Sequence, residues 1–172
     1  MKYCVIIPFF IIVAVSCSSI STNETLAQIH YSYYPNNTLK ELYYFKLKNK
    51  KRIKDGDCLL FRDGKLIRHA RFKMGIYDGL QEIITDNYIK HLFYHNGNLI
   101  WVKVYNSNKL VTFCNFKHNM PFNGYIWNIH YAKLAKHSLI YEFDKGRVIN
   151  IFKCDKNGDI IKKIDEAPPF HL

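Results

Sequence analysis

The stretch Phe61-Arg-Asp-Gly64-Lys-Leu66, followed by Phe72-Lys-Met-Gly75, recurs as Tyr94-His-Asn-Gly97-Asn-Leu99, followed by Tyr105-Asn-Ser-Asn108. Both copies contain an aromatic residue, a two-residue turn signal that ends in glycine, and a leucine two residues later. A second aromatic residue follows eight residues after the glycine, and the copies are displaced by 33 residues throughout. Repetition at a fixed spacing is typical of proteins built from stacked copies of one structural unit.

Short β-rich runs separated by turn signals extend from Leu42 toward the C-terminus. Asp-Gly and Asn-Gly favour the type I′ turn of a two-residue hairpin, because both central residues need a positive φ. The turn dipeptides are Asp55-Gly56, Asp63-Gly64, Asp78-Gly79, Asn96-Gly97, Asn123-Gly124, Lys145-Gly146 and Asn157-Gly158. They predict a meander of hairpins whose repeat turns contain Gly56, Gly64, Gly75, Gly79, Gly97 and Gly124.

The pattern of side chains predicts strands rather than helices. Residues 125–131 alternate in polarity, which is typical of a strand with one solvent-facing side. Residues 99–105 are largely apolar at both parities, which predicts a central or covered strand. Residues 131–139 are the only helix candidate and could equally form a loop or a strand. The predicted fold is all-β, with stacked β-hairpin repeats in one elongated, twisted antiparallel sheet and little helix outside a signal peptide.

The repeats resemble MORN-variant repeats, which are about 22 or 23 residues long. The consensus of that family runs aromatic, turn, Gly-Lys-Leu, aromatic, Gly and Asp-Gly. The matching residues are Phe61, Gly64-Lys65-Leu66, Phe72, Gly75 and Asp78-Gly79. Later copies depart from the consensus, with Asn98 in place of lysine and Asn108 and Asn119 in place of glycine. The resemblance covers roughly residues 55–160 and implies a long sheet of consecutive hairpins. It does not imply any catalytic residue.

The N-terminal residues predict export. Lys2 precedes an apolar run at 5–15, which is shorter than the about 20 residues of a membrane-spanning helix but suits the core of a signal peptide. Small residues precede Cys17 and Ser18-Ser19 follow it, a pattern that resembles the bacterial lipobox, in which the cysteine is lipidated. Ordinary secretion and an uncleaved membrane anchor are the alternatives. The predicted organisation is a signal peptide at 1–16, a tether and entry strand at 17–40, and a β-hairpin repeat domain at 41–172.

The chain is strongly basic, with a formal net charge of +11 at pH 7. Basic residues cluster at 46–54, where Lys50, Lys51 and Arg52 are adjacent. Such a cluster can bind an anionic membrane surface or a surface polymer. Alternatively, the lysines keep a chain with 16% aromatic residues in solution and protect its sheet edges. We expect no nucleic-acid partner.

Aromatic residues of the repeats are expected to pack against the next hairpin, because a single hairpin is marginally stable. Trp101 and Trp127 fall outside the repeat pattern, so we predict that they belong to an exposed binding surface, although tryptophan is common in cores as well. Cys58, Cys114 and Cys154 are widely and irregularly spaced. They predict small buried side chains, with one possible disulfide among them, and no cysteine pair for metal or redox chemistry.

No motif marks a catalytic or metal site. His91 and His95 would share one face of a helix, but in a strand they lie about 13 Å apart, too far for one metal ion. The segment 155–159 has two aspartates of a calcium loop without the remaining ligands, so it predicts a hairpin turn. A nucleophilic pair of Cys58 or Cys114 with a histidine is permitted by the composition alone. We therefore expect no enzyme, no cofactor and no metal.

Together these features predict a non-enzymatic, lipid-anchored β-repeat protein of the bacterial cell envelope. It would act as a scaffold or protein-interaction module, whose sheet face binds another protein or a surface polymer. The MORN resemblance implies an alternative, because many related bacterial proteins resemble immunity proteins or antitoxins that neutralise a toxin by direct binding. A third possibility is recognition of an anionic lipid or surface polymer by the basic clusters, which salt would weaken.

Overall fold

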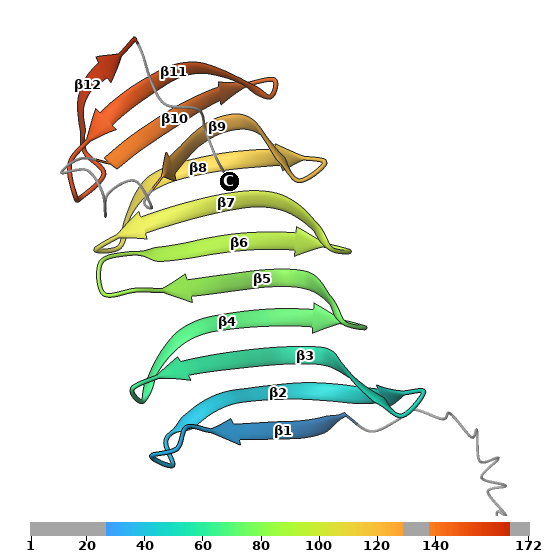
Figure 1. Cartoon of the computed structure of the whole chain (residues 1–172). Coiled ribbons are helices and arrows are strands. Elements are labelled where there is room, and N and C mark those ends of the chain that lie inside the picture. Colours follow the sequence, from blue (N-terminus) through green and yellow to red (C-terminus); the bar gives the residue numbers. More distant parts are fainter. Residues whose placement is uncertain (1–26, 129–137, 166–172) are drawn as a thin grey trace, which may run out of the picture.

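Twelve strands form one open sheet in the computed structural model of this chain, which describes residues 27–128 and 138–165. Each strand pairs antiparallel with its neighbours in the sequence, so the order in the sheet is the order in the chain (Figure 1). In these two ranges there is no helix, and hence none long and apolar enough to cross a membrane. The predicted all-β fold of stacked hairpins is confirmed.

The strands are between 5 and 12 residues long. They are β1 (Gln28–Tyr33), β2 (Leu39–Lys48), β3 (Lys51–Arg62), β4 (Lys65–Lys73), β5 (Ile76–Ile84), β6 (Ile89–His95), β7 (Asn98–Asn106), β8 (Lys109–Lys117), β9 (Met120–Asn128), β10 (Ser138–Asp144), β11 (Arg147–Cys154) and β12 (Ile160–Ile164). The turns at 49–50, 74–75, 96–97, 118–119 and 145–146 lie along one side of the sheet, on the right in Figure 1. We call this side the hairpin-tip edge, and the other side the opposite edge.

Positive backbone φ angles define the turns of the hairpin-tip edge. Both central residues of every turn there have φ between +48° and +87°, which is the conformation of a type I′ turn. Gly97 occupies such a turn, and Gly64 occupies an equivalent turn at the opposite edge, as their dipeptides predict. Gly75 also occupies a turn of the hairpin-tip edge, as its place in the repeat predicts. Met74 and His118 also adopt a positive φ. Their residue types are unusual at such positions, so the sequence does not mark these two turns clearly.

The turns predicted at Gly56, Gly79 and Gly124 are wrong. These glycines lie inside β3, β5 and β9 with φ of +115°, +110° and +117°. Gly56 and Gly79 lie in the stretches where the strand pairing shifts register, and Gly124 lies two residues after such a shift at Phe122, so all three belong to β-bulges. An Asx-Gly pair readily supplies the positive φ that a bulge and a hairpin turn both use, which is why the dipeptide predicts either one.

Each of these bulges binds the turn of the next hairpin along the sheet. At β3, the N–H of Met74 donates to Asp55 Oδ1 at 3.0 Å, and the N–H of Gly75 donates to the Lys54 carbonyl at 2.8 Å. We call this pair of hydrogen bonds the bulge clamp. It recurs with Asp78 and Tyr77 accepting from Asn96 and Gly97, and with Asn123 and Phe122 accepting from Lys145 and Gly146. The clamp therefore ties the β4–β5, β6–β7 and β10–β11 hairpins each to the bulged strand before it.

β7 carries a bulge at the corresponding position without a glycine. The spacing from Gly79 places Trp101 where the other copies have glycine, and the register shifts beside it. Here the β8–β9 turn supplies the acceptor, because Asn119 Oδ1 accepts from the N–H of Leu99 at 2.7 Å.

The structural repeat is two strands long, because successive bulges and turns of the hairpin-tip edge lie two strands apart. The displacement of 33 residues spans three strands, so its two copies turn at opposite edges of the sheet.

Two apolar clusters lie on the two faces of β10. The first consists of Leu92, Val102, Val104, Trp127, Ile140 and Cys154, and the second of Cys114, Leu139, Tyr141 and Phe143. β10 is therefore the strand covered on both faces. The prediction that residues 99–105 form a central or covered strand is confirmed, because β7 is central in the sheet. It is not covered on both faces, since Ile100 remains 37% exposed.

Two smaller predictions also concern turns and termini. Asp155 Oδ1 accepts from the N–H groups of Asn157 and Asp159 at 2.8 and 2.9 Å, so this segment is a hairpin turn, as predicted. β1 lies within the predicted tether and entry strand. The predicted helix candidate at 131–139 falls mostly outside the described residues, and Ser138 already belongs to β10.

Removing the acceptor of a bulge clamp should destabilise the sheet. In Asp78→Ala the N–H of Asn96 loses its protein partner, and a lost hydrogen bond of this kind costs about 1 kcal/mol. Asp78→Asn keeps an acceptor oxygen and should stay within about 0.5 kcal/mol of the wild type. Guanidinium unfolding of both variants measures the difference. An Asp78→Ala protein as stable as the wild type would show that the clamp contributes nothing.

Gly124 is the glycine at which an added side chain meets the most backbone. A Cβ there would lie 2.3 Å from the carbonyl oxygen of Phe113, whereas the Cβ position at Gly64 has no atom within 4 Å. Both glycines have a positive φ. We expect Gly124→Ala to lower the free energy of unfolding by about 3 kcal/mol and Gly64→Ala by about 1 kcal/mol. Equal losses in thermal or chemical denaturation would contradict the close backbone approach at β9.

Candidate functional site

The hairpin-tip edge carries exposed aliphatic side chains on every one of its hairpins. Each of them lies within three residues of a turn. Their exposed fractions are 45% for Leu47, 49% for Met74, 48% for Ile76, 37% for Ile100, 60% for Met120 and 40% for Val148. Single exposed hydrophobic residues are normal, but a row along one edge is typical of an interaction site.

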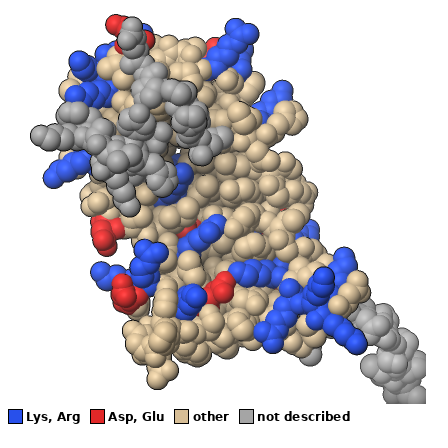
Figure 2. All heavy atoms as spheres, viewed as in Figure 1, with Lys and Arg blue, Asp and Glu red and all other residues tan. Residues whose placement is uncertain are grey.

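Basic side chains flank this aliphatic row. They are Lys46, Lys48, Lys50, Lys51, Arg52, Lys73, Lys117, Lys145 and Arg147. Figure 2 shows the densest group at the lower right, around the β2–β3 hairpin, where the predicted residues Lys50, Lys51 and Arg52 lie exposed. Asp55 and Asp78 of this edge are engaged in bulge clamps. The edge is therefore basic overall.

Asp55 stays ionised within this basic edge. Its carboxylate pairs with Lys46 at 2.8 Å and accepts from Met74. The hydrogen bond from Lys46, followed by that from the Met74 N–H, holds the pKa of Asp55 below its usual range. The bulge clamp of β3 therefore keeps a charged acceptor at neutral pH.

The chain enters the sheet from the hairpin-tip edge. Gln28, at the start of β1, pairs with Phe45 near the end of β2, and Tyr33 pairs with Leu39 at the opposite edge. Ala27 lines the same hollow as Lys46. The predicted signal peptide and Cys17 lie outside the described residues. β1 begins on the side that carries the basic and aliphatic row (Figure 1).

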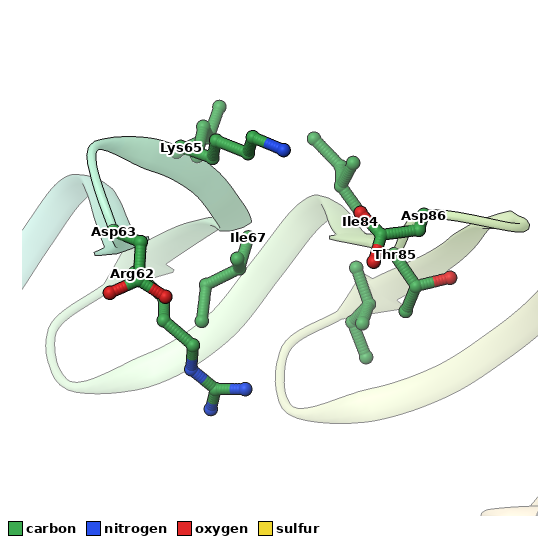
Figure 3. A pocket seen from close by; sticks show the side chains of 9 residues that line it. Arg62, Asp63, Lys65, Ile67, Ile84, Thr85 and Asp86 are labelled. Atoms are coloured by element: carbon green, nitrogen blue, oxygen red, sulfur yellow. The ribbon is translucent and has the colours of Figure 1, made fainter.

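The opposite edge has a different character. A gap of about 460 Å³ separates its β3–β4 and β5–β6 turns (Figure 3). It is lined by Arg62, Asp63, Lys65, Leu66, Ile67, Ile83, Ile84, Thr85 and Asp86. The Thr85 hydroxyl accepts from the N–H of Tyr88 at 3.1 Å and donates to its carbonyl at 3.0 Å, so it closes its own turn. Both signs of charge line this gap, with no excess of either.

The structure separates the two tryptophans that the sequence groups together. Trp127 is 5% exposed, because it packs into the apolar cluster with Val102, so its prediction as a surface residue is wrong. Trp101 is half-buried on the face of the sheet. Its ring stacks on Phe93 at 5.5 Å, with 11° between the planes, and Lys103 Nζ lies 4.9 Å from it. Trp101 thus offers an aromatic and cationic patch.

Histidines and carboxylates alternate across the same face as Trp101. His69 Nε2 lies 3.1 Å from Asp57 Oδ1, and His91 Nε2 lies 3.0 Å from Glu82 Oε1. In the described part of the chain, no three such residues are placed to hold a metal ion together. His95 lies near the tip of β6, apart from His91.

The three described cysteines are buried and free. Burial raises the pKa of each thiol, that of Cys114 to about 11. Cys58 Sγ contacts Lys54 and Glu41, and Cys114 Sγ donates to a backbone carbonyl. Between residues 27 and 128, neither thiol has a histidine as hydrogen-bond partner. The cysteine–histidine nucleophile considered from composition is therefore not assembled there.

A cluster of polar side chains lies in mid-strand on the face that also carries Ala70 and Leu92, which we call the core face. Lys54 Nζ donates to Glu41 Oε1 at 2.6 Å. The same ammonium group lies 4.6 Å from the ring of Tyr43. The sequence places Lys54 in an apparently exposed basic run, and only the pairing with Phe45 turns it onto the core face.

Arg68 and Gln81 complete this polar cluster. Arg68 Nη2 donates to the Tyr77 hydroxyl at 2.8 Å and to Gln81 Oε1 at 2.7 Å. Arg68 Nε and Gln81 Nε2 are buried without a hydrogen-bond partner. A pocket of about 80 Å³ adjoins these groups, lined by Glu41, Lys54, Cys58, Leu60, Arg68, Ala70, Phe72 and Tyr77. We define the polar cluster as Glu41, Lys54, Cys58, Arg68, Tyr77 and Gln81.

No family model, no curated protein and no solved structure matches this chain. Its function must therefore be inferred from its own surfaces: the basic and aliphatic hairpin-tip edge, the patch around Trp101 and the polar cluster. The sheet of hairpins is shown directly, whereas the resemblance to MORN-variant repeats still rests on the sequence motifs.

The ion pair of the polar cluster should make stability depend on pH in acid. Burial raises the pKa of Glu41, but Lys54 lowers it by more, so the pKa lies below its usual range. A lowered pKa stabilises the fold above about pH 4.3, and this contribution is lost as the pH falls through the folded value. The stability difference between wild type and Glu41→Gln should therefore shrink from pH 7 to pH 3. Urea unfolding measures it, with Asp86→Asn in an exposed turn as control.

Proposed function

We propose that this protein is a non-enzymatic interaction module of the bacterial cell envelope, built from MORN-like repeats and anchored by a lipid on Cys17. The observation that best supports this proposal is the hairpin-tip edge. It combines a row of exposed aliphatic side chains, flanking basic side chains and the point at which the chain enters the sheet. An anchored N-terminus would hold this edge next to the bilayer.

The chemistry of the edge suits an anionic membrane surface. Each lysine or arginine close to such a surface contributes about 1 kcal/mol of attraction. Aliphatic side chains such as Met120 and Leu47 gain further free energy by entering the interfacial region, at roughly 25 cal/mol per Å² of apolar area removed from water. Hairpin tips follow one another at about 10 Å, twice the strand spacing, so several tips can contact the surface together.

Contact of this edge with the membrane would leave the faces of the sheet accessible. The strands run away from the hairpin-tip edge, so both faces stand at an angle to a surface that touches the tips (Figure 1). Trp101, Phe93 and Lys103 would then face the periphery of the envelope rather than the lipid. We propose these faces as the surface for a second protein or a surface polymer, which gives the module its role as a scaffold.

The anchor and the edge can be tested separately. Intact mass and membrane fractionation of wild type and Cys17→Ala in a bacterial host test the anchor: the variant should lose a lipid-sized mass and leave the membrane fraction. Purified Cys17→Ala protein then tests the edge by sedimentation with vesicles of phosphatidylcholine, with and without phosphatidylglycerol. We expect binding to anionic vesicles only, and weaker binding as salt rises.

Matched variants locate the contact on one edge. Changing Lys50, Lys51 and Arg52 to glutamine should weaken vesicle binding roughly hundredfold, at about 1 kcal/mol for each charge. Leu47→Ser with Met120→Ser, at 45% and 60% exposure, has a control at the opposite edge in Leu110→Ser with Tyr33→Ser, at 47% and 59%. Only the first pair should weaken binding. Equal losses from both pairs, or equal binding to neutral vesicles, would reject the edge as the membrane contact.

A further inference from the structure

We propose that the polar cluster is a pocket for a carboxylate, presented by an acidic segment of a partner protein. This inference rests on the proposed role of the sheet faces and names the chemistry and the place of the contact. The pocket lies in mid-strand on the core face, between Glu41 of β2 and Tyr77 of β5. It is separate from the basic residues of the hairpin-tip edge at Lys50, Lys51 and Arg52.

The unpaired polar atoms of the cluster are donors. Arg68 Nε and Gln81 Nε2 are buried without a partner, and Gln81 is only 2% exposed. A buried polar atom without a hydrogen bond costs about 1–3 kcal/mol, so an acceptor supplied from outside the chain stabilises this arrangement. Water can serve as that acceptor, but a carboxylate forms a stronger, charge-assisted hydrogen bond with arginine.

The charge of the cluster also favours an anion. Lys54 and Arg68 are cationic and Glu41 is anionic, so the cluster carries an excess of one positive charge. Glu41 is bound to Lys54 at 2.6 Å. The partners of the Arg68 guanidinium in the described ranges are the neutral groups of Tyr77 and Gln81. Arg68 is therefore the cation available to an incoming carboxylate.

The size and lining of the pocket favour the end of an acidic side chain. Its volume is about 80 Å³, whereas a single water needs only about 10–15 Å³ of such space, so a carboxylate group can enter. Leu60, Ala70 and the rings of Phe72 and Tyr77 supply apolar walls, which suit the methylene groups of glutamate or aspartate. A carboxylate can thus reach Arg68, which lines the pocket and is hydrogen-bonded to Gln81, while its stem packs against these walls.

The two unpaired donors can be observed directly by ¹⁵N NMR, because arginine Nε–H and glutamine side-chain N–H₂ groups give their own signals. The probe is the peptide acetyl-Glu-Glu-Glu-amide, titrated into Cys17→Ala protein, and acetyl-Gln-Gln-Gln-amide is the neutral control. We expect the glutamate peptide to shift the Arg68 Nε–H and Gln81 side-chain signals. The glutamine peptide should leave both signals in place.

Variants then test whether these donors supply the binding energy. Arg68→Gln should weaken binding of the glutamate peptide at least tenfold, since a hydrogen bond to a charged group contributes about 1.5–3 kcal/mol. Gln81→Met keeps the side-chain volume and removes the amide, and it should weaken binding severalfold. Arg71→Gln, an exposed arginine of the same strand, is the matched control and should change affinity less than twofold. The backbone ¹⁵N spectrum of each variant confirms that it is folded.

Three outcomes would overturn the proposal. If the peptide leaves both donor signals unshifted, water alone satisfies them. If inorganic phosphate shifts them and the peptide does not, the pocket is a phosphate site. If shifts appear only at residues 46–52, acidic peptides bind the hairpin-tip edge, which rejects the pocket but leaves the proposed interaction module standing. Vesicle binding of Arg68→Gln should match that of its Cys17→Ala parent, so the two proposals can fail independently.

Discussion

The hydrogen bonds between a β-bulge and the turn of the next hairpin are the constraint on which this sheet depends. Ladder hydrogen bonds join neighbouring strands in any antiparallel sheet, but they leave the central N–H groups of a two-residue turn unpaired. Asp55, Asp78 and Asn123 provide acceptors for these groups from the preceding repeat. The bulge fixes the position of the turn, and the turn in return fixes the register of the bulged strand. Each repeat is thus complete only when its neighbour is present.

The sequence could predict the hairpins, but it could not predict which turn signals form hairpin turns and which form β-bulges. Asp-Gly and Asn-Gly report a positive φ, and the chain uses that conformation in type I′ turns at Gly64 and Gly97 and in bulges at Gly56 and Gly79. The order along the chain cannot separate the two uses, because both recur once per repeat. The local sequence of β10 also does not predict that both its faces are buried, because this burial depends on packing with β6–β8 and β11.

The candidate sites illustrate the same limit. The basic run at 46–54 is visible in the sequence, whereas the aliphatic row is not, because Leu47, Ile100 and Met120 come together only when alternate turns share one edge. Lys54 belongs to the basic run but faces inward, since the two-residue excess at the Gly56 bulge sets its pairing with β2. Arg68 and Gln81 stand in different strands, and no spacing rule connects them. Trp127 also lies outside the repeat pattern, but it is buried in the apolar cluster.

The two-strand repeat also lets the length of the sheet vary with the number of repeats. Because each clamp involves only adjacent repeats, inserting or deleting one unit of 22 or 23 residues among the N-terminal hairpins would preserve the type of clamp and change the length of the sheet by about 10 Å. Copies such as that around Trp101 can lose the glycine and still hold their turn through Asn119. The sequence within a repeat and the number of repeats can therefore change independently. The length of the sheet can thus change while the hydrogen bonds that join its repeats stay the same.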